Sequence, residues 1–195
     1  MGSILSLLLQ KCDNRLTISG KNNIICDKRE RNMKTITVLL VKNLDWVSNI
    51  LCHICGHGYT HASIGLEDND IFYSFNFRGF CIETSEKHRR RGVKESLCFQ
   101  LTVTNETYDF LQKQIQHFEN NKEQYKYSKF GVFCCALRLP ITRENRYFCS
   151  HFVAELLSIS GAVQLRKSAS LYFPNQFRRE LERFSGLCNT LYNPV

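Results

Sequence analysis

One short run, His61 to Leu66, constrains the fold of this chain more than any other feature of the sequence. Its even-numbered positions are apolar and its odd-numbered positions are polar or glycine, which is the period of a strand with one face toward a core. The polar segment 67–70 then leads the chain into the aromatic run 71–75. These patterns predict a β-hairpin, in which His61 and Ser74 are candidates to lie across from one another.

Further strands and helices follow from the same periodicities. Residues 35–41 and 96–103 are rich in β-branched and apolar residues and predict two more strands. We expect helices near residues 46–51, over 105–120 behind a capping Thr104, from about Phe148 to Ser160-Gly161, and in an amphipathic stretch over 176–184.

The size and composition indicate one domain. The chain has 195 residues, of which 43% are hydrophobic and 23% charged, and it holds only 3 prolines. This composition excludes global disorder, collagen-like repeats and coiled coils, and the length is that of one ordinary domain. We expect residues 1–33 to be a partly flexible leader and residues 34–195 to form the domain.

The net charge of +8 does not by itself indicate nucleic-acid binding. Half of the excess lies in residues 1–34, within and next to the leader. A second basic run, residues 87–94, has no aromatic residues between its charges for stacking on bases, and no nucleic-acid module accompanies it. We therefore expect this run to be a solvated loop and expect no nucleic-acid partner.

Ten cysteines would suit a disulfide framework in an exported protein, but we find no secretion signal in the chain. The apolar stretch 4–9 has no Lys or Arg before it and is far shorter than the ~20 residues that span a bilayer. We therefore expect a cytoplasmic protein with reduced thiols. The opening around Gly2 fits the N-myristoylation pattern, with Cys12 as a second membrane signal, so membrane association through the N-terminus is a secondary expectation.

Cys149 and His61 are the residues best placed for covalent chemistry. Cys149 lies in the first turn of the helix expected from Phe148, where the helix dipole stabilises a thiolate. His61 lies on the polar side of a rigid strand, where an imidazole can accept the thiol proton and return it to a leaving group. His151 is about 200° around the helix from the thiol, so we expect it to pack or to form a hydrogen bond instead.

The segments around these two residues resemble a known enzyme family. They are the hairpin sequence Thr60-His61-Ala62-Ser63-Ile64-Gly65-Leu66, the following Phe72-Tyr73-Ser74-Phe75 and Arg78-Gly79-Phe80, and the distant Phe148-Cys149-Ser150-His151-Phe152-Val153. Together they resemble the circularly permuted, NlpC-type papain-like hydrolases, in which the histidine strand precedes the cysteine helix. The cysteine segment is also similar to that of lecithin:retinol acyltransferase, a member of the same permuted set.

The resemblance implies a fold and a function. The fold is α+β and papain-like, with a small, mainly antiparallel sheet and the catalytic-cysteine helix packed against it. The function is a peptidase or amidase, in which Cys149 attacks an amide, ester or thioester carbonyl and His61 acts as base and then acid, without a cofactor. An acyltransferase and a noncatalytic binding module of the same fold are the alternatives. Specificity would lie in residues 77–94 and 121–129.

A third group normally orients the histidine in this family. The matching position falls at or near Ser74, where many relatives carry Glu, Gln, Asn or His. A serine orients an imidazole less strongly, so Asn76 and Glu83 are alternatives for this role.

A zinc site is the competing interpretation of the same region. Cys52, Cys55, His57 and His61 are ligand types for zinc, and the two cysteines have a typical spacing. A closed site needs a second spaced pair, and Cys134 and Cys135 are adjacent instead. Zinc bound to His61 would exclude the hydrolase interpretation.

Overall fold

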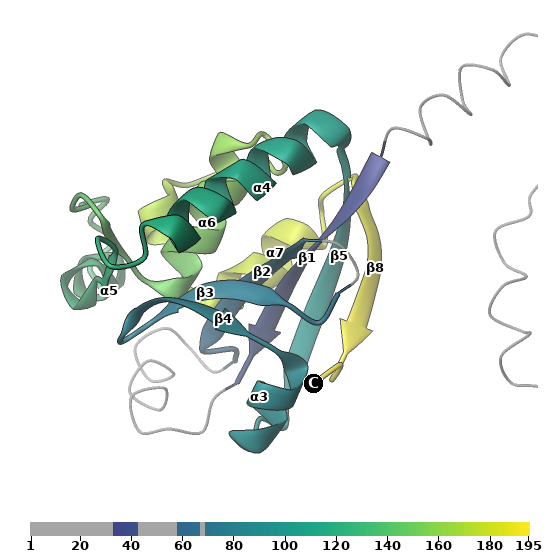
Figure 1. Cartoon of the computed structure of the whole chain (residues 1–195), viewed down its shortest axis with the longest axis horizontal. Helices are drawn as coiled ribbons and strands as arrows, with labels where there is room; N and C mark the ends of the chain where they lie inside the picture. The colour runs from purple at the N-terminus through teal and green to yellow at the C-terminus, as the bar shows by residue number, and fades with distance from the viewer. Residues whose placement is uncertain (1–32, 43–57, 67–68) are drawn as a thin grey trace, which may run out of the picture. The chain divides into compact units, whose positions relative to one another are not determined.

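The computed structural model describes residues 33–42, 58–66 and 69–195, which form an α+β structure. Six of the strands make one antiparallel sheet in the order β4-β3-β2-β1-β5-β8 (Figure 1). These strands are β1 (Met33–Val41), β2 (His61–Leu66), β3 (Phe72–Asn76), β4 (Gly79–Glu83), β5 (Ser96–Thr104) and β8 (Leu187–Tyr192).

Helices and one small parallel strand pair complete the described part. The pair is β6 (Lys126–Tyr127) with β7 (Arg146–Tyr147). The α-helices are α3 (Ser85–Arg90), α4 (Asn105–Asn120), α5 (Lys129–Ala136), α6 (Cys149–Ile159) and α7 (Phe177–Leu181), with 3-10 turns η1 (Ala169–Leu171) and η2 (Pro174–Gln176).

The predicted hairpin is confirmed. Strands β2 and β3 are antiparallel, with Ile64 opposite Tyr73 and Gly65 opposite Phe72. The expectation that His61 lies across from Ser74 was wrong, because this register is offset from that pairing by two residues. The apolar positions of β2 enter the main core, as the alternation predicted. Its other positions are buried as well, including His61 and Ser63, because β2 lies in the interior of the sheet.

The predicted strands at 35–41 and 96–103 correspond to β1 and β5. Strand β1 is central, and its Val38 lies opposite Ile64 on one side and Phe99 on the other. A strand with neighbours on both edges satisfies its backbone hydrogen bonds, which is consistent with the near-continuous apolar run of β1.

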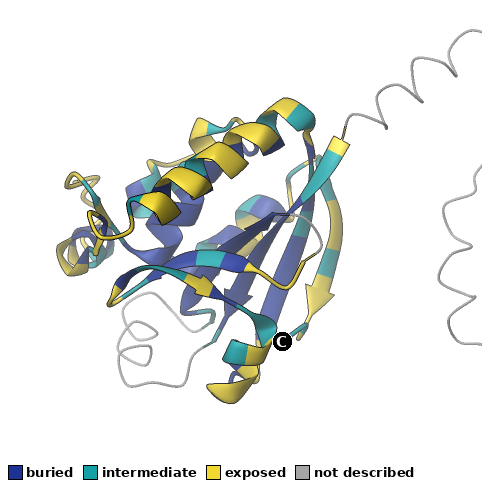
Figure 2. Cartoon of the chain, viewed as in Figure 1, coloured by how far each residue is buried: buried dark blue, intermediate teal, exposed yellow. Residues whose placement is uncertain are grey.

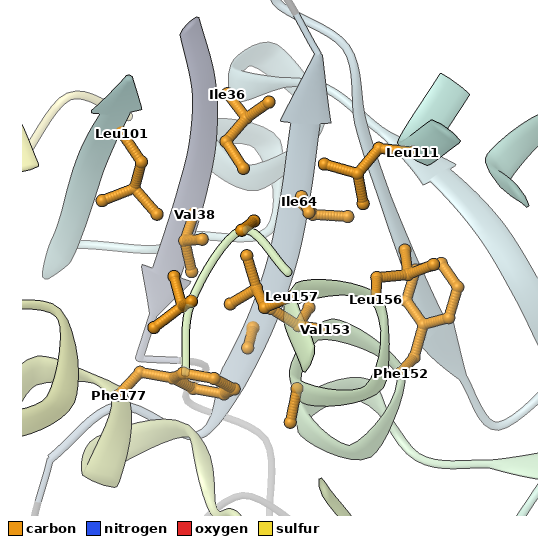
Figure 3. Close-up of a cluster of buried hydrophobic side chains, with 14 of the residues drawn as sticks. Ile36, Val38, Ile64, Leu101, Leu111, Phe152, Val153, Leu156, Leu157 and Phe177 are labelled. Carbon is orange, nitrogen blue, oxygen red and sulfur yellow. The ribbon is translucent and has the colours of Figure 1, made fainter. Parts of the chain in front are cut away.

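The main core lies between the sheet and helices α4, α6 and α7 (Figure 3). The strands contribute Ile36, Val38, Ile64 and Leu101, and the helices contribute Leu111, Phe152, Val153, Leu156, Leu157 and Phe177. Each such side chain contributes roughly 1.5–3 kcal/mol when fully buried. Helix α6 contacts β2 and β3, so the packing that stabilises the fold also fixes the start of α6 against the start of the hairpin.

Helix α4 confirms the amphipathic prediction. Its buried residues include Leu111 and Phe118, while its outer face is exposed (Figure 2). The Thr104 side chain accepts a hydrogen bond from the Thr107 amide, which caps the helix as expected. Helix α6 ends at the predicted place, where Gly161 follows with a φ of +70° that favours glycine.

Two further expectations were wrong. The basic run 87–94 is not only a solvated loop, because its first residues belong to α3, where Thr84 caps the helix and His88 is buried. The amphipathic stretch 176–184 forms only the short helix α7, and the chain then adds the unpredicted edge strand β8. Local periodicity does not reveal an edge strand of this kind, because its burial pattern is mostly exposed.

Several sequence predictions lie outside the described residues. They are the helix at 46–51, the zinc candidates Cys52, Cys55 and His57, and the acylation pattern at Gly2. Among the residues that are described, no helix combines the length and the apolar character needed to cross a bilayer.

Candidate active site

Cys149 is the first residue of α6. The preceding residue, Phe148, has an extended backbone, and its side chain accepts no hydrogen bond from the amide groups in the first turn of α6. The backbone amides of Ser150 and Ala62 donate to the sulfur instead. The thiol is therefore set in a position that stabilises negative charge, as the sequence predicted.

His61 lies against this thiol. The side chains of Cys149 and His61 hydrogen-bond to each other, and both residues are only 7% exposed. Burial by itself raises the pKa of the Cys149 thiol. The hydrogen bond and positive charge of His61, together with the two backbone amides, outweigh burial and hold this pKa below its ordinary value. The geometry favours a thiolate beside an imidazolium.

Glu83 is the acidic partner of His61. Nε2 of His61 donates to Oε2 of Glu83 over 2.6 Å, so Nδ1 is the ring nitrogen left for the thiol. Burial of the imidazole opposes protonation, but the Glu83 charge and the bonds to Glu83 and Cys149 raise the pKa of His61 to about 10. Burial likewise opposes ionisation of Glu83, yet the charge of His61 outweighs it and lowers the pKa of the carboxyl to about 2.

Two further residues surround the Glu83 carboxylate. Arg91 donates from Nη1 to Oε1 over 3.2 Å. Nε2 of His88 lies 3.6 Å from Oε2, and the fully buried His88 ring has no hydrogen-bond partner in the described structure. Burial, which outweighs the Glu83 charge, lowers the pKa of His88 to about 4, so this imidazole is neutral near pH 7.

Ser74 and Asn76 have other partners. The Ser74 hydroxyl donates to the backbone carbonyl of Ala62 over 2.7 Å, next to His61 in the chain. Asn76 accepts a hydrogen bond from the amide of Arg78 in the β3–β4 turn. Of the three candidates for the orienting role, Glu83 is therefore the one hydrogen-bonded to the imidazole.

His151 has the structural surroundings expected for it. It is buried in α6, its ring stacks on Tyr147 with 4.9 Å between centroids, and its Nε2 lies 3.1 Å from Oε2 of Glu155. Tyr147 donates to the other Glu155 oxygen over 3.0 Å. This group ties β7 to α6 on the side of the helix away from the thiol.

The metal alternative is not tested at three of its four residues, which lie outside the described ranges. The fourth, His61, uses its side chain to bond Glu83 and Cys149. Across the described ranges, no group of three or more histidine, cysteine, aspartate or glutamate side chains is arranged to hold a metal ion.

No protein-family model matches this chain, and no curated protein matches its sequence.

Sequence reasoning missed His88 and Arg91, which it placed in a solvated basic run. A signal was present, because Thr84 before a charged, proline-free segment is a usual helix start. A helix at that point turns one side of the run inward, toward the Glu83 carboxylate.

Proposed function

We propose that the protein is a cysteine-dependent hydrolase of the permuted papain-like, NlpC-type class, acting on an amide, ester or thioester. The observation that carries the proposal is the buried chain of contacts from Cys149 at a helix start through His61 to Glu83. Nucleophile, base and orienting carboxylate in hydrogen-bonded order are the arrangement that activates a thiol for acyl transfer.

The reaction has two steps. In the first, the Cys149 sulfur attacks the substrate carbonyl carbon, a C–S bond forms and the bond to the leaving group breaks. The His61 imidazolium gives its proton to the leaving amine or alcohol. In the second, neutral His61 takes a proton from water, the resulting hydroxide attacks the thioester, and the C–S bond breaks to release a carboxylic acid and the thiolate.

The surrounding groups support these roles. The amides of Ser150 and Ala62 donate to the sulfur, and we propose that they also stabilise the oxyanion that forms on a carbonyl bound to it. Glu83 fixes the imidazole tautomer and stabilises its charged form. The buried position limits access of bulk water to the ion pair, which strengthens every charge interaction in it.

Alkylation of the native protein with iodoacetamide tests the proposal, with each modified cysteine located by peptide mapping. Cys149 should react faster than the exposed Cys188 although Cys149 is buried, because a thiolate and not a thiol is the nucleophile. Cys81 is a matched internal control, since burial and the charge of Glu83 raise its pKa to about 12 and should leave it unreactive.

The variants His61→Ala and Cys149→Ala complete this test. His61→Ala should remove the rate advantage of Cys149 over Cys188. An activated ester, p-nitrophenyl acetate, should acetylate wild type at Cys149 and give a burst of nitrophenolate that Cys149→Ala lacks. If Cys149 reacts no faster than Cys188, or if its rate survives His61→Ala, the catalytic proposal is wrong.

A further inference from the structure

A pocket lies beside the start of α6 and is not used by the chemistry described above. It has a volume of about 450 Å³. It is formed between α5 and the segment that carries η1 and η2, and its lining residues are Cys135, Ala136, Arg138, Lys167, Leu171, Phe173 and Gln176. None of these residues belongs to the segments 77–94 and 121–129 in which the sequence suggested that specificity would lie.

Contacts connect this pocket to the active site by two routes. Phe148, which directly precedes the nucleophile, packs in one buried cluster with Cys135 and Phe173 of the pocket wall. On the other route, Gly58 lies against Asn175, because a Cβ placed on Gly58 would be 3.3 Å from the Cβ of Asn175. In the sequence, Asn175 stands between two pocket residues, Phe173, which caps η2, and Gln176, which belongs to η2. Gly58 leads into β2 and His61, so the segment 173–176 both lines the pocket and contacts the chain just before the catalytic histidine.

The charges of the pocket are of one sign. Its lining holds two cations, Arg138 and Lys167, and no carboxylate. Lys167 donates from Nζ to the amide oxygen of Gln176 over 3.4 Å, which places the ammonium group at the pocket wall. Arg138 has a φ of +59° because it follows the C-cap of α5, where the amides of Arg138 and Leu139 donate to the carbonyls of Cys135 and Cys134 and close the helix end.

We propose that this pocket binds an anionic group, a carboxylate or phosphate, on the acyl substrate that Cys149 attacks. The inference rests on the proposed function, because it assigns a substrate class to that site. The Arg138 guanidinium matches the geometry of two anionic oxygens, Lys167 adds a second charge, and Leu171 and Phe173 offer apolar surface to the carbon chain that bears the anion.

Chloroacetyl probes test this assignment, because they alkylate Cys149 and differ only in the group they offer to the pocket. The pair is N-chloroacetyl-glutamate and the uncharged, equally sized N-chloroacetyl-glutamine, and N-chloroacetyl-phosphoserine distinguishes phosphate from carboxylate. Wild type should react about tenfold faster with the glutamate probe than with the glutamine probe, as expected for a charge-assisted contact.

Arg138→Gln and Lys167→Gln, singly and together, should bring this ratio close to unity. Arg138→Lys should restore part of the ratio. The matched control is Lys113→Gln, an exposed cation on α4 outside the pocket lining, which should keep the wild-type ratio. His61 is common to all these proteins, so its own attraction for anions cancels in the comparison.

The outcomes are distinct. A ratio that is unchanged in the double variant overturns the pocket assignment, while the His61-dependent reaction with neutral iodoacetamide would still support the hydrolase. Loss of that iodoacetamide dependence would overturn the hydrolase proposal, whatever the ratio. A preference for the phosphoserine probe, lost in the double variant, identifies phosphate as the group, and a preference for the glutamate probe identifies a carboxylate.

Discussion

The imidazole of His61 and the carboxylate of Glu83 form a buried hydrogen bond of 2.6 Å between two strands that are not neighbours in the sheet. Strand β2 carries the histidine, β4 ends at the glutamate, and β3 lies between them. The pKa of His61 is raised to about 10 and that of Glu83 is lowered to about 2, so both groups are charged across the neutral range.

Glu83→Gln removes the charge from the partner of His61 while keeping a side chain of similar shape. The pKa of His61 should fall, the thiolate of Cys149 should lose its stabilising imidazolium, and alkylation of Cys149 at pH 6.5 should slow by about tenfold or more. The measurement is the iodoacetamide rate at Cys149, with the rate at Cys188 in the same sample as reference.

Ser74→Ala is the matched control for that variant. It removes one buried neutral hydrogen bond, so the free energy of unfolding should fall by about 1 kcal/mol while the Cys149 rate stays within about twofold of wild type. If Ser74→Ala slows Cys149 as much as Glu83→Gln does, Glu83 is not the sole orienting residue and Ser74 shares that role.

The pH dependence of Cys149 should differ from that of an ordinary thiol. An ordinary thiol loses its thiolate as the pH falls below about 8.5. Because His61 and two backbone amides lower the pKa of Cys149, its thiolate should persist to lower pH and then be lost as the pH falls through the folded-state value. Thiolate absorbance in the ultraviolet, corrected with Cys149→Ala, measures this midpoint.

His61→Ala should move the midpoint of Cys149 in the opposite direction, to higher pH than in wild type, because the imidazolium then no longer offsets the effect of burial. Turnover of an amide substrate by wild type should decline as the pH rises through about 10, where His61 loses the proton that the leaving group needs. An unshifted midpoint in His61→Ala would contradict the ion-pair interpretation.

His88 should make the fold sensitive to mild acid. Its pKa is lowered from 6.5 to about 4, so between these pH values the unfolded chain binds a proton that the folded protein does not. Stability is therefore unaffected by this group above pH 6.5 and falls as the pH drops toward 4. Urea unfolding of wild type should show this decline, and His88→Gln should remove it.

Glu83 and His61 do not cause this decline in stability between pH 6.5 and 4. Glu83 contributes stability that is complete above pH 4.5 and is lost as the pH falls through about 2, below the window in question. The contribution of His61 is complete below pH 6.5 and is lost only as the pH rises through about 10. An identical slope in wild type and His88→Gln between pH 4 and 6.5 would show that His88 is not the source.

His151→Ala should affect stability and leave the chemistry intact. It removes the ring stacked on Tyr147 and the partner of Glu155, both on the side of α6 away from the thiol. We expect a loss of about 1–3 kcal/mol in the free energy of unfolding, measured by denaturant titration. The iodoacetamide rate at Cys149 should stay at the wild-type value. If His151→Ala slows the alkylation of Cys149 as much as His61→Ala does, His151 takes part in activating the thiol.

Much of the fold is encoded locally. Alternation over 61–66 predicted the hairpin, and Thr104 and Gly161 marked helix ends because capping depends on the backbone within one turn. Strand β8 was missed because an edge strand has little burial to pattern it. Helix α3 was missed because its charges suggested a solvated loop, although the Thr84 cap was readable.

The sequence by itself determined that Cys149 would begin a helix and that His61 would lie on a strand, because both depend on periodicity and on residues nearby in the chain. Only the tertiary structure decided which side chain partners the imidazole. Ser74 and Glu83 are both within reach in sequence, but strand pairing and the buried environment place a carboxylate and not a hydroxyl at Nε2. A hydrogen bond between strands separated by a third depends on sheet geometry, which no local pattern encodes.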